Sequence, residues 1–408
     1  MTLNKSLIGS SRDFKSELSK VLSESVEEAQ WREANTFTSV AGPVESRIVL
    51  FGAGGLGLRT LIGLRKVGIE PCAFSDNNRK LWGTQIEGVS VLSPEDAVGR
   101  FKDSAVFVVS IWGADSPHRY AHSVNQLADL GCEFIVPISW LSWKYSKQLL
   151  PHYMLDLPSK VVAQSKSVFE CFELFADDRS RAEFVSQIQW RLTGDPGCLA
   201  HPEPGEQYLV TDISSFIPSE IVVDCGAYDG DTLHSWLKER GPFGAYVALE
   251  PDPSSRARLE ASLKQLPPEV SNRVRVLPYA VSDRTGTVTF SATGLPSASV
   301  VAADGVVIDS IALDDLQSEF SDQAPTFLKM DIEGAELDAF KGGARFIQTF
   351  KPMMAIAAYH RQDHLWQIPL AVTNIWPEYK CYIRPHNEEG WDLIFYAVPP
   401  DRSRADSR

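Results

Sequence analysis

Two segments of this chain follow one plan: a short β-branched run, a loop rich in glycine, and a stretch with helical periodicity. The first runs from Arg47 to about Val67 around the loop Gly52–Gly57, and the second begins at Ile221 and turns at Gly226–Gly230. A strand that leads through a glycine turn into a helix opens a βαβ unit, and such units build parallel sheets covered by helices. The sequence therefore predicts an α/β chain with two doubly wound units.

Further short apolar runs continue the alternation of strand and helix after each loop. In the first unit we expect strands at 71–75, 105–110 and 133–138 and a helix near 118–130. In the second unit we expect five core strands and a terminal antiparallel pair, at 221–225, 245–249, 273–278, 326–330, 353–359, 379–384 and 392–398. The terminal pair belongs at the edge of a sheet that is otherwise parallel.

These patterns also set the expected domain boundaries. We expect a helical lead-in at 1–45, a first α/β domain at 46–150, a helical connector and linker at 151–207, a second α/β domain at 208–400 and a flexible tail at 401–408. The lead-in has apolar residues at helical spacing, the linker is rich in Gly and Pro, and the tail is polar.

The charge and the cysteines exclude several classes of protein. The chain has 39 Lys and Arg against 53 Asp and Glu, and its net charge of −14 repels nucleic acid and anionic membranes. No run approaches the roughly 20 apolar residues of a membrane helix, and the N-terminus lacks the apolar centre of a secretory signal. The six cysteines form no CxxC pair, so we expect reduced thiols, no zinc site and a cytoplasmic location.

The first glycine loop fits a dinucleotide-binding fingerprint. Gly52, Gly54 and Gly57 satisfy GxGxxG between a strand and a helix, with Gly55 inside the motif, and Asp76 follows 19 residues after Gly57. Such glycines let backbone N–H groups approach a phosphate, while the acid accepts hydrogen bonds from ribose hydroxyls. In a second interpretation the glycines only permit a tight turn, and Asp76 caps a turn.

The segments FSDNN at 74–78 and GTQIEGVSVL at 83–92 extend this pattern. With them, the first domain resembles the Rossmann-like N-terminal domain of sugar acyltransferases and of some sugar-modifying enzymes. The resemblance implies a nucleotide-sugar or a similar ligand rather than a redox cofactor.

The second loop carries acids instead of a third glycine or a P-loop lysine. Gly226 and Gly230 let the chain pass close to a ligand without a pyrophosphate, and Asp224 is placed to accept from a cationic amino group. Glu250 ends the next strand, 26 residues past Asp224, where it can accept from both hydroxyls of a ribose. These features fit S-adenosylmethionine, bound outside the carboxyl ends of adjacent strands. The other expected contacts of this cofactor are Tyr228, Asp252, Ser282 and Asp283, the last two near its adenine.

Five motifs in this part of the chain form a specific combination. They are VDCGAYDGDT at 223–232, LEPD at 249–252, AVSD at 280–283, FLKMDIEGAE at 327–336 and AAYHRQDHLWQIPL at 357–370. On these motifs, residues from about 165 to 398 resemble the FkbM family of S-adenosylmethionine-dependent methyltransferases. The resemblance implies a class I methyltransferase sheet of seven strands. It also implies O-methylation of a hydroxyl, often on a sugar, glycolipid or polyketide-type acceptor. We expect a carbohydrate, a nucleotide-sugar or a related natural product as the acceptor, and the two glycine loops with different acid partners suggest that the first domain holds or presents it.

Transfer to a hydroxyl requires a group that takes the hydroxyl proton, and His360, at the end of the expected fifth strand, is the first candidate. Asp331 is expected at the cofactor or at a substrate hydroxyl, and Glu333 as an acceptor ligand or base. Lys329 is expected to bind an acceptor oxygen or to pair with an acid, and Asp363 to orient the imidazole. A divalent cation held by Asp331, Glu333 and His360 is an alternative, but we expect no metal.

Two other functions fit parts of the sequence. A nicotinamide-dependent oxidoreductase would use the first glycine loop and bind its substrate with the second domain. A non-catalytic protein would bind a sugar nucleotide without acting on it. The acids at 224 and 250 favour the methyltransferase.

Overall fold

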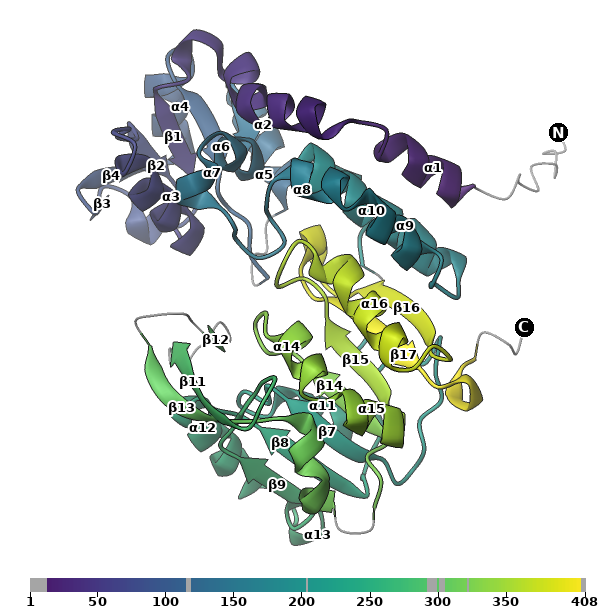
Figure 1. Cartoon of the computed structure of the whole chain (residues 1–408). Coiled ribbons are helices and arrows are strands. Elements are labelled where there is room, and N and C mark those ends of the chain that lie inside the picture. Colours follow the sequence, from purple (N-terminus) through teal and green to yellow (C-terminus); the bar gives the residue numbers. More distant parts are fainter. Residues whose placement is uncertain are drawn as a thin grey trace, which may run out of the picture.

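Two sheets with mostly parallel strands form the framework of the protein (Figure 1). The computed structural model describes residues 13–114, 119–202, 205–291, 299–300, 305–320 and 323–404. The prediction of an α/β fold with two such sheets, the second of seven strands, is confirmed. Within the described part of the chain, no helix combines the length and the apolar character that crossing a membrane requires.

The first sheet is built from residues between 48 and 137. Its strands, in spatial order, are β3 (Gln85–Ile86), β4 (Val89–Leu92), β2 (Ala73–Ser75), β1 (Ile48–Phe51), β5 (Val106–Val109) and β6 (Ile135–Pro137). Only β3 and β4 pair antiparallel. The central strands β1 and β5 are buried along their whole length, which explains their uninterrupted apolar sequences. The helices of this unit are α3 (Gly55–Arg65), α4 (Pro94–Phe101), α5 (Tyr120–Asp129), α6 (Ile138–Lys144) and α7 (Ser146–Leu149).

The second sheet has the predicted five parallel strands and an antiparallel edge pair. Its strands, in spatial order, are β16 (Lys380–Pro385), β17 (Leu393–Val398), β15 (Met353–Ala357), β14 (Phe327–Met330), β7 (Ile221–Cys225), β8 (Ala245–Leu249) and β9 (Val274–Leu277). β17 runs antiparallel to both of its neighbours. The helices of this unit are α11 (Asp231–Glu239), α12 (Pro253–Leu263), α13 (Pro268–Ser271), α14 (Glu336–Lys341), α15 (Ala344–Phe350) and α16 (His364–Ile375).

A layer of connecting helices packs on both units. α1 (Phe14–Val21) contacts α10 (Asp178–Thr193), α2 (Val26–Ala41) contacts α8 (Pro158–Ala163), and α9 (Ser165–Phe172) contacts α16. In Figure 1 this layer lies above the seven-stranded sheet. The lead-in contains two helices rather than one, because Ser25 and Glu28 form a capping box that starts α2.

Two further features differ from the expectation. A third sheet contains β10 (Ala280–Val281), β13 (Val306–Ile311), β11 (Gly286–Ser291) and β12 (Ser299–Val300). These strands have no long apolar run, and β13 is largely exposed.

The predicted flexible tail is wrong for residues 401–404, because Arg402 forms an ion pair with the buried Glu220 and donates to the Thr326 carbonyl at 2.8 Å. Residues 405–408 lie outside the described residues.

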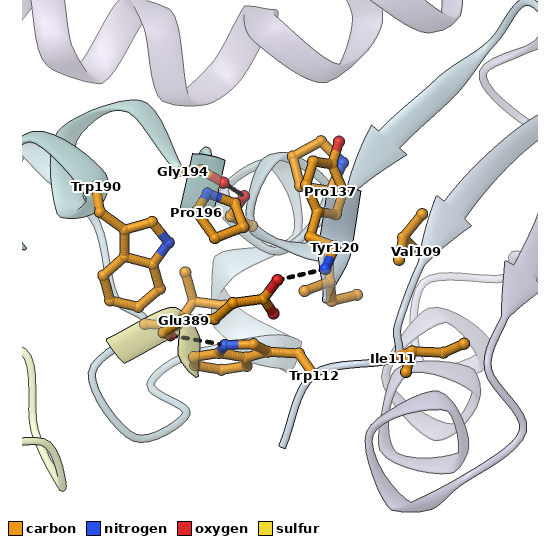
Figure 2. A pocket seen from close by; sticks show the side chains of 12 residues that line it. Val109, Ile111, Trp112, Tyr120, Pro137, Trp190, Gly194, Pro196 and Glu389 are labelled. Carbon is orange, nitrogen blue, oxygen red and sulfur yellow. Dashed lines mark hydrogen bonds between the residues drawn. The ribbon is translucent and has the colours of Figure 1, made fainter. Parts of the chain in front are cut away.

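The two units meet around Trp112, which follows β5. Its indole ring lies 4.9 Å from that of Trp391 and 5.7 Å from that of Trp190, and its Nε1–H donates to the Glu389 carbonyl at 3.2 Å. The Glu389 carboxylate accepts from the backbone N–H of Tyr120 in the first unit. Figure 2 shows Trp112, Trp190, Tyr120 and Glu389 around a small apolar cavity. The loop between β16 and β17 therefore ties the seven-stranded sheet to the six-stranded one.

Glu389 makes this junction sensitive to pH. Burial raises the pKa of its carboxyl from 4.5 to about 7, although the hydrogen bond from Tyr120 lowers it. Because the pKa is higher in the folded state, the stability that a protonated Glu389 contributes at low pH is lost as the pH rises through about 7. We expect Glu389→Gln, which cannot ionise, to raise the melting temperature over that of the native chain at pH 8 and by much less at pH 5.

Thermal unfolding of both chains at the two pH values measures this difference. Glu378→Gln is the control, because Glu378 is exposed on the surface of the second unit. A gain in melting temperature of equal size at pH 5 and pH 8 would show that ionisation of Glu389 does not affect the junction.

Candidate active site

The candidate site lies at the carboxyl ends of β7, β8 and β14, which are neighbours in the seven-stranded sheet. A cavity opens there with about 540 Å³ of empty space when the open solvent at its mouth is included. We call it the Glu250 cavity. Its wall consists of Gly226, Tyr228, Glu250, Pro251, Ser255, Tyr279, Ala280, Val281, Phe290, Asp331, Ile332, Glu333 and Ala335.

The backbone fixes the carboxylate of Glu250 in this wall. Its Oε2 accepts from the Tyr228 N–H at 2.8 Å, and its Oε1 accepts from the Asp252 N–H at 2.8 Å. Burial raises the pKa of Glu250 to about 7. Each carboxylate oxygen keeps a further lone pair, so Glu250 can accept from hydroxyls of a ligand in the cavity.

Asp224 does not line this cavity. It is fully buried, its Oδ2 accepts from the Tyr246 hydroxyl at 2.6 Å, and its Oδ1 lies 3.0 Å from Lys329 Nζ. Lys329 also donates to the Gly226 carbonyl at 2.6 Å. Burial lowers the pKa of Lys329, but Asp224 and Asp331 raise it above its ordinary value. Asp224 is therefore engaged within the fold, and its contact with a ligand amino group stays a prediction. Lys329 pairs with an acid, the second of its two predicted roles.

Other predicted cofactor contacts also lie outside the cavity wall. Asp252 is buried and caps α12, where its Oδ1 accepts from two backbone N–H groups at 2.9 Å. Ser282 is buried and Asp283 is exposed, while Ala280 and Val281 line the cavity in their place. For these three residues the cofactor contact stays a prediction.

The loop after β7 depends on a close approach of two backbones. Gly226 has a φ of +80°, and a Cβ there would lie 1.9 Å from the Asp331 carbonyl oxygen, so a side chain does not fit. Tyr228 lines the cavity, and its ring faces the guanidinium of Arg258 at 5.0 Å. Gly230 lies beyond the cavity wall and precedes α11 with a φ of +94°, and its cofactor contact stays a prediction.

Asp331, Glu333 and His360 come together at the edge of the Glu250 cavity. His360 Nε2 lies 3.1 Å from Asp331 Oδ1 and 3.8 Å from Glu333 Oε1. On the other side of the ring, His360 Nδ1 lies 2.7 Å from Oε1 of Glu336, which is fully buried. The second oxygen of Glu336 lies 3.2 Å from Nδ1 of His364. The three residues singled out by the sequence therefore form one cluster, which we call the carboxylate–His360 cluster.

The neighbours of His360 oppose its predicted role as a base. Burial alone would lower the pKa of the imidazole, but Glu336 and Asp331 raise it well above its ordinary value. These neighbours favour the protonated ring, and the role of His360 as the group that takes the proton of the acceptor stays a prediction. Glu336 rather than Asp363 orients the ring; Asp363 lies at the start of α16.

Two tyrosines that the sequence analysis missed complete the site. The Tyr208 hydroxyl donates to Asp331 Oδ2 at 2.5 Å, and the Tyr153 ring lies 6.3 Å from the ring of His360. Burial raises the pKa of the neighbouring Glu333 to about 7. Both tyrosines precede the sheet that carries the acids, and no spacing or motif in the sequence connects them with it.

His360 also lines a second cavity, which has about 760 Å³ of empty space including its mouth. We call it the Tyr153 cavity. Its other lining residues come from the connector and from the loop after β15, and they are Pro151, Tyr153, Asp156, Lys160, Gln164, Arg361, Gln362 and Asp363. The carboxylate–His360 cluster thus borders both cavities, since Asp331 and Glu333 line the first and His360 lines the second.

In the first unit, the glycine loop makes contacts within the fold. A Cβ on Gly57 would lie 2.0 Å from the Gly52 carbonyl oxygen, and Asp76 accepts from the Ala53 N–H and the Asn78 N–H at 2.7 Å each. These contacts agree with the second interpretation, in which the glycines permit a turn and Asp76 caps it. Gly54 and Gly55 adjoin open space, and a nucleotide site there stays a prediction.

Comparisons with known proteins agree with the C-terminal architecture. The family model described as Methyltransferase FkbM domain matches residues 224–380. The 2-O-methyltransferase NoeI of Sinorhizobium fredii is 26% identical over an alignment of 202 residues that covers 43% of this chain and 79% of that protein. The crystal structure of methyltransferase FkbM from Methylobacillus flagellatus KT has the same fold, with a TM-score of 0.76 at 23% identity over 94% of this chain and 99% of the other. Residues 224–380 of this chain therefore match the family model of a methyltransferase FkbM domain, and the chain has the fold of a methyltransferase FkbM.

Proposed function

We propose that this protein transfers a methyl group from S-adenosylmethionine to a hydroxyl oxygen of a carbohydrate, a nucleotide-sugar or a related acceptor. The observation that carries the proposal is the position of the carboxylate–His360 cluster between the Glu250 cavity and the Tyr153 cavity. A transferase needs two binding sites that meet at the reacting atoms. NoeI is named as a 2-O-methyltransferase, and this name supports oxygen as the atom that receives the methyl group.

The wall of the Glu250 cavity fits the cofactor. The fixed Glu250 carboxylate can accept from both ribose hydroxyls, and Tyr279 and Val281 offer apolar surface to the adenine. Asp331 and Glu333 place carboxylates in the same wall, which favours a ligand with positive charge. When bound, S-adenosylmethionine supplies a methyl group on a positively charged sulfur.

The Tyr153 cavity fits an acceptor rich in hydroxyl groups. Asp156, Lys160, Gln164 and Arg361 contribute hydrogen-bond donors and acceptors to its wall. The Tyr153 ring adds an apolar face with a polar end, which suits the mixed surface of a sugar. We therefore assign this cavity to the acceptor.

The chain contributes to the reaction mainly by positioning the acceptor oxygen. Methyl transfer is a single in-line displacement, so the acceptor oxygen must be held about 3 Å from the carbon that it attacks. Asp331 Oδ1 and Glu333 Oε1 are placed to accept the hydrogen bond of that hydroxyl and to take its proton. His360 Nε2 lies beside both carboxylates, 3.1 Å from Asp331 Oδ1 and 3.8 Å from Glu333 Oε1.

Isothermal titration of the full chain with S-adenosylmethionine and with NADH tests the proposal. We expect binding of S-adenosylmethionine, and we expect Glu250→Gln to weaken it at least tenfold, because charge-assisted hydrogen bonds to the ribose are lost. Glu260→Gln, an exposed position on α12, is the matched control and should bind like the native chain. Binding of NADH without binding of S-adenosylmethionine would overturn the proposal.

A further inference from the structure

We infer that Asp331, Glu333 and His360 bind one divalent cation, of the Mn²⁺ or Mg²⁺ kind, between the Glu250 cavity and the Tyr153 cavity. One ligand atom from each residue lies within 4.8 Å of the other two. This reverses the expectation of no metal. The catalytic part of the inference rests on the proposed function, while the binding of the cation does not.

The distances within the cluster suit an octahedral ion. Oxygen and nitrogen ligands bind such ions at about 2.1–2.3 Å, so neighbouring ligands are about 3 Å apart and opposite ligands about 4.4 Å apart. His360 Nε2 lies 3.1 Å from Asp331 Oδ1 and 3.8 Å from Glu333 Oε1. Both distances fall between the two limits, so a cation can bind after only small movements of the side chains.

His360 points an unpartnered nitrogen into this space. Its side chain is 1% exposed, and Nε2 has no hydrogen-bond partner of adequate geometry among the described residues, although Asp331 Oδ1 lies 3.1 Å away. Its Nδ1 is bound to Glu336, and the outer oxygen of Asp331 is bound to Tyr208. Outer partners that fix a histidine and a carboxylate while the inner atoms face one another are typical of metal ligands.

The charge of the cluster also favours a cation. Asp331, Glu333 and Glu336 surround one imidazole, so an excess of negative charge remains even when His360 is protonated. The nearby Lys329 is already paired with Asp224. A divalent cation would offset this excess. Two carboxylates with one imidazole suit Mn²⁺ or Mg²⁺ better than a metal that prefers thiolates.

A divalent cation at this position would lower the pKa of the acceptor hydroxyl, which His360 alone does not do. Coordination to a divalent ion lowers the pKa of a bound hydroxyl, so the hydroxyl gives up its proton more readily. Because the cluster borders both cavities, the open coordination positions of the ion would face the acceptor and the reacting centre.

Titration of the full chain with Mn²⁺, followed by the electron paramagnetic resonance signal of the free ion, tests this inference without any turnover. We expect one site per chain, with Mg²⁺ as a competitor. Asp331→Asn and Glu333→Gln should each weaken binding of Mn²⁺ at least tenfold. Asp338→Asn is the matched control, because Asp338 lies exposed on α14 and pairs with Lys341 at 2.7 Å. Circular dichroism confirms that each variant is folded.

Each outcome decides between the two hypotheses. Absence of Mn²⁺ binding by the native chain, or unchanged binding by the double variant Asp331→Asn/Glu333→Gln, overturns the cation site. If S-adenosylmethionine still binds in the same samples, the proposed function survives that result. If Mn²⁺ binds at the cluster and S-adenosylmethionine does not bind, the cation site stands and the proposed function fails.

Discussion

Replacing Lys329 with methionine is expected to lower the free energy of unfolding by about 3–5 kcal/mol. The side chains of Lys329 and Asp224 are 3% and 0% exposed, so the variant leaves an uncompensated carboxylate in the core. It also removes the hydrogen bond to the Gly226 carbonyl, which holds the loop after β7. Urea denaturation measures the loss, and Lys341→Met, at an exposed lysine, should change stability little.

A second substitution separates this explanation from a direct role in ligand binding. Adding Asp224→Leu to Lys329→Met removes the unpaired charge, and a buried pair replaced by apolar groups of similar size is often neutral in stability. The double variant should therefore recover most of the lost free energy. Normal stability of Lys329→Met, together with lost binding of S-adenosylmethionine, would mean that this pair contacts the cofactor after all.

The sequence predicted the main sheets because their central strands are buried on both faces. β7 and β14 are covered along their whole length and consist almost entirely of apolar residues. Burial stabilises the strands of the third sheet little. In β13, apolar and polar residues do not alternate regularly, and the strand is largely exposed. Their pairing depends on tertiary contacts, which a local pattern does not contain.

The sequence placed the acids at one edge of the sheet but did not predict their contacts. Acids at strand ends gather at the same edge, yet the direction of each side chain depends on the register. Asp224 and Lys329 are direct partners across β7 and β14, and paired residues of neighbouring strands point to the same face. The register therefore explains their ion pair and the absence of Asp224 from the wall of the Glu250 cavity. Tyr153 and Tyr208 reach the site from the connector side through tertiary packing alone.

Replacing His360 with asparagine is expected to lower kcat by about 10²–10⁴-fold, the usual range for a group that supports proton transfer. Asparagine cannot offset the charges of Asp331 and Glu333, and these carboxylates would no longer be held at the meeting point of the two cavities. Affinity for S-adenosylmethionine should change by less than about threefold, because Glu250 is unchanged. Formation of S-adenosylhomocysteine with a panel of monosaccharides and nucleotide-sugars measures the rate.

A lower kcat with nearly unchanged affinity for the cofactor distinguishes this role from a general structural one. A buried histidine also contributes to stability, so Glu333→Gln, at the more exposed edge of the cluster, serves as the second variant and should lower kcat in the same direction. His122→Asn, exposed on α5 in the first unit, should retain the native rate. Native turnover in both His360→Asn and Glu333→Gln would show that the acceptor reacts away from the cluster. Because both cavities meet at this cluster, such a result would remove the structural basis of the proposed reaction, and not only one residue from it.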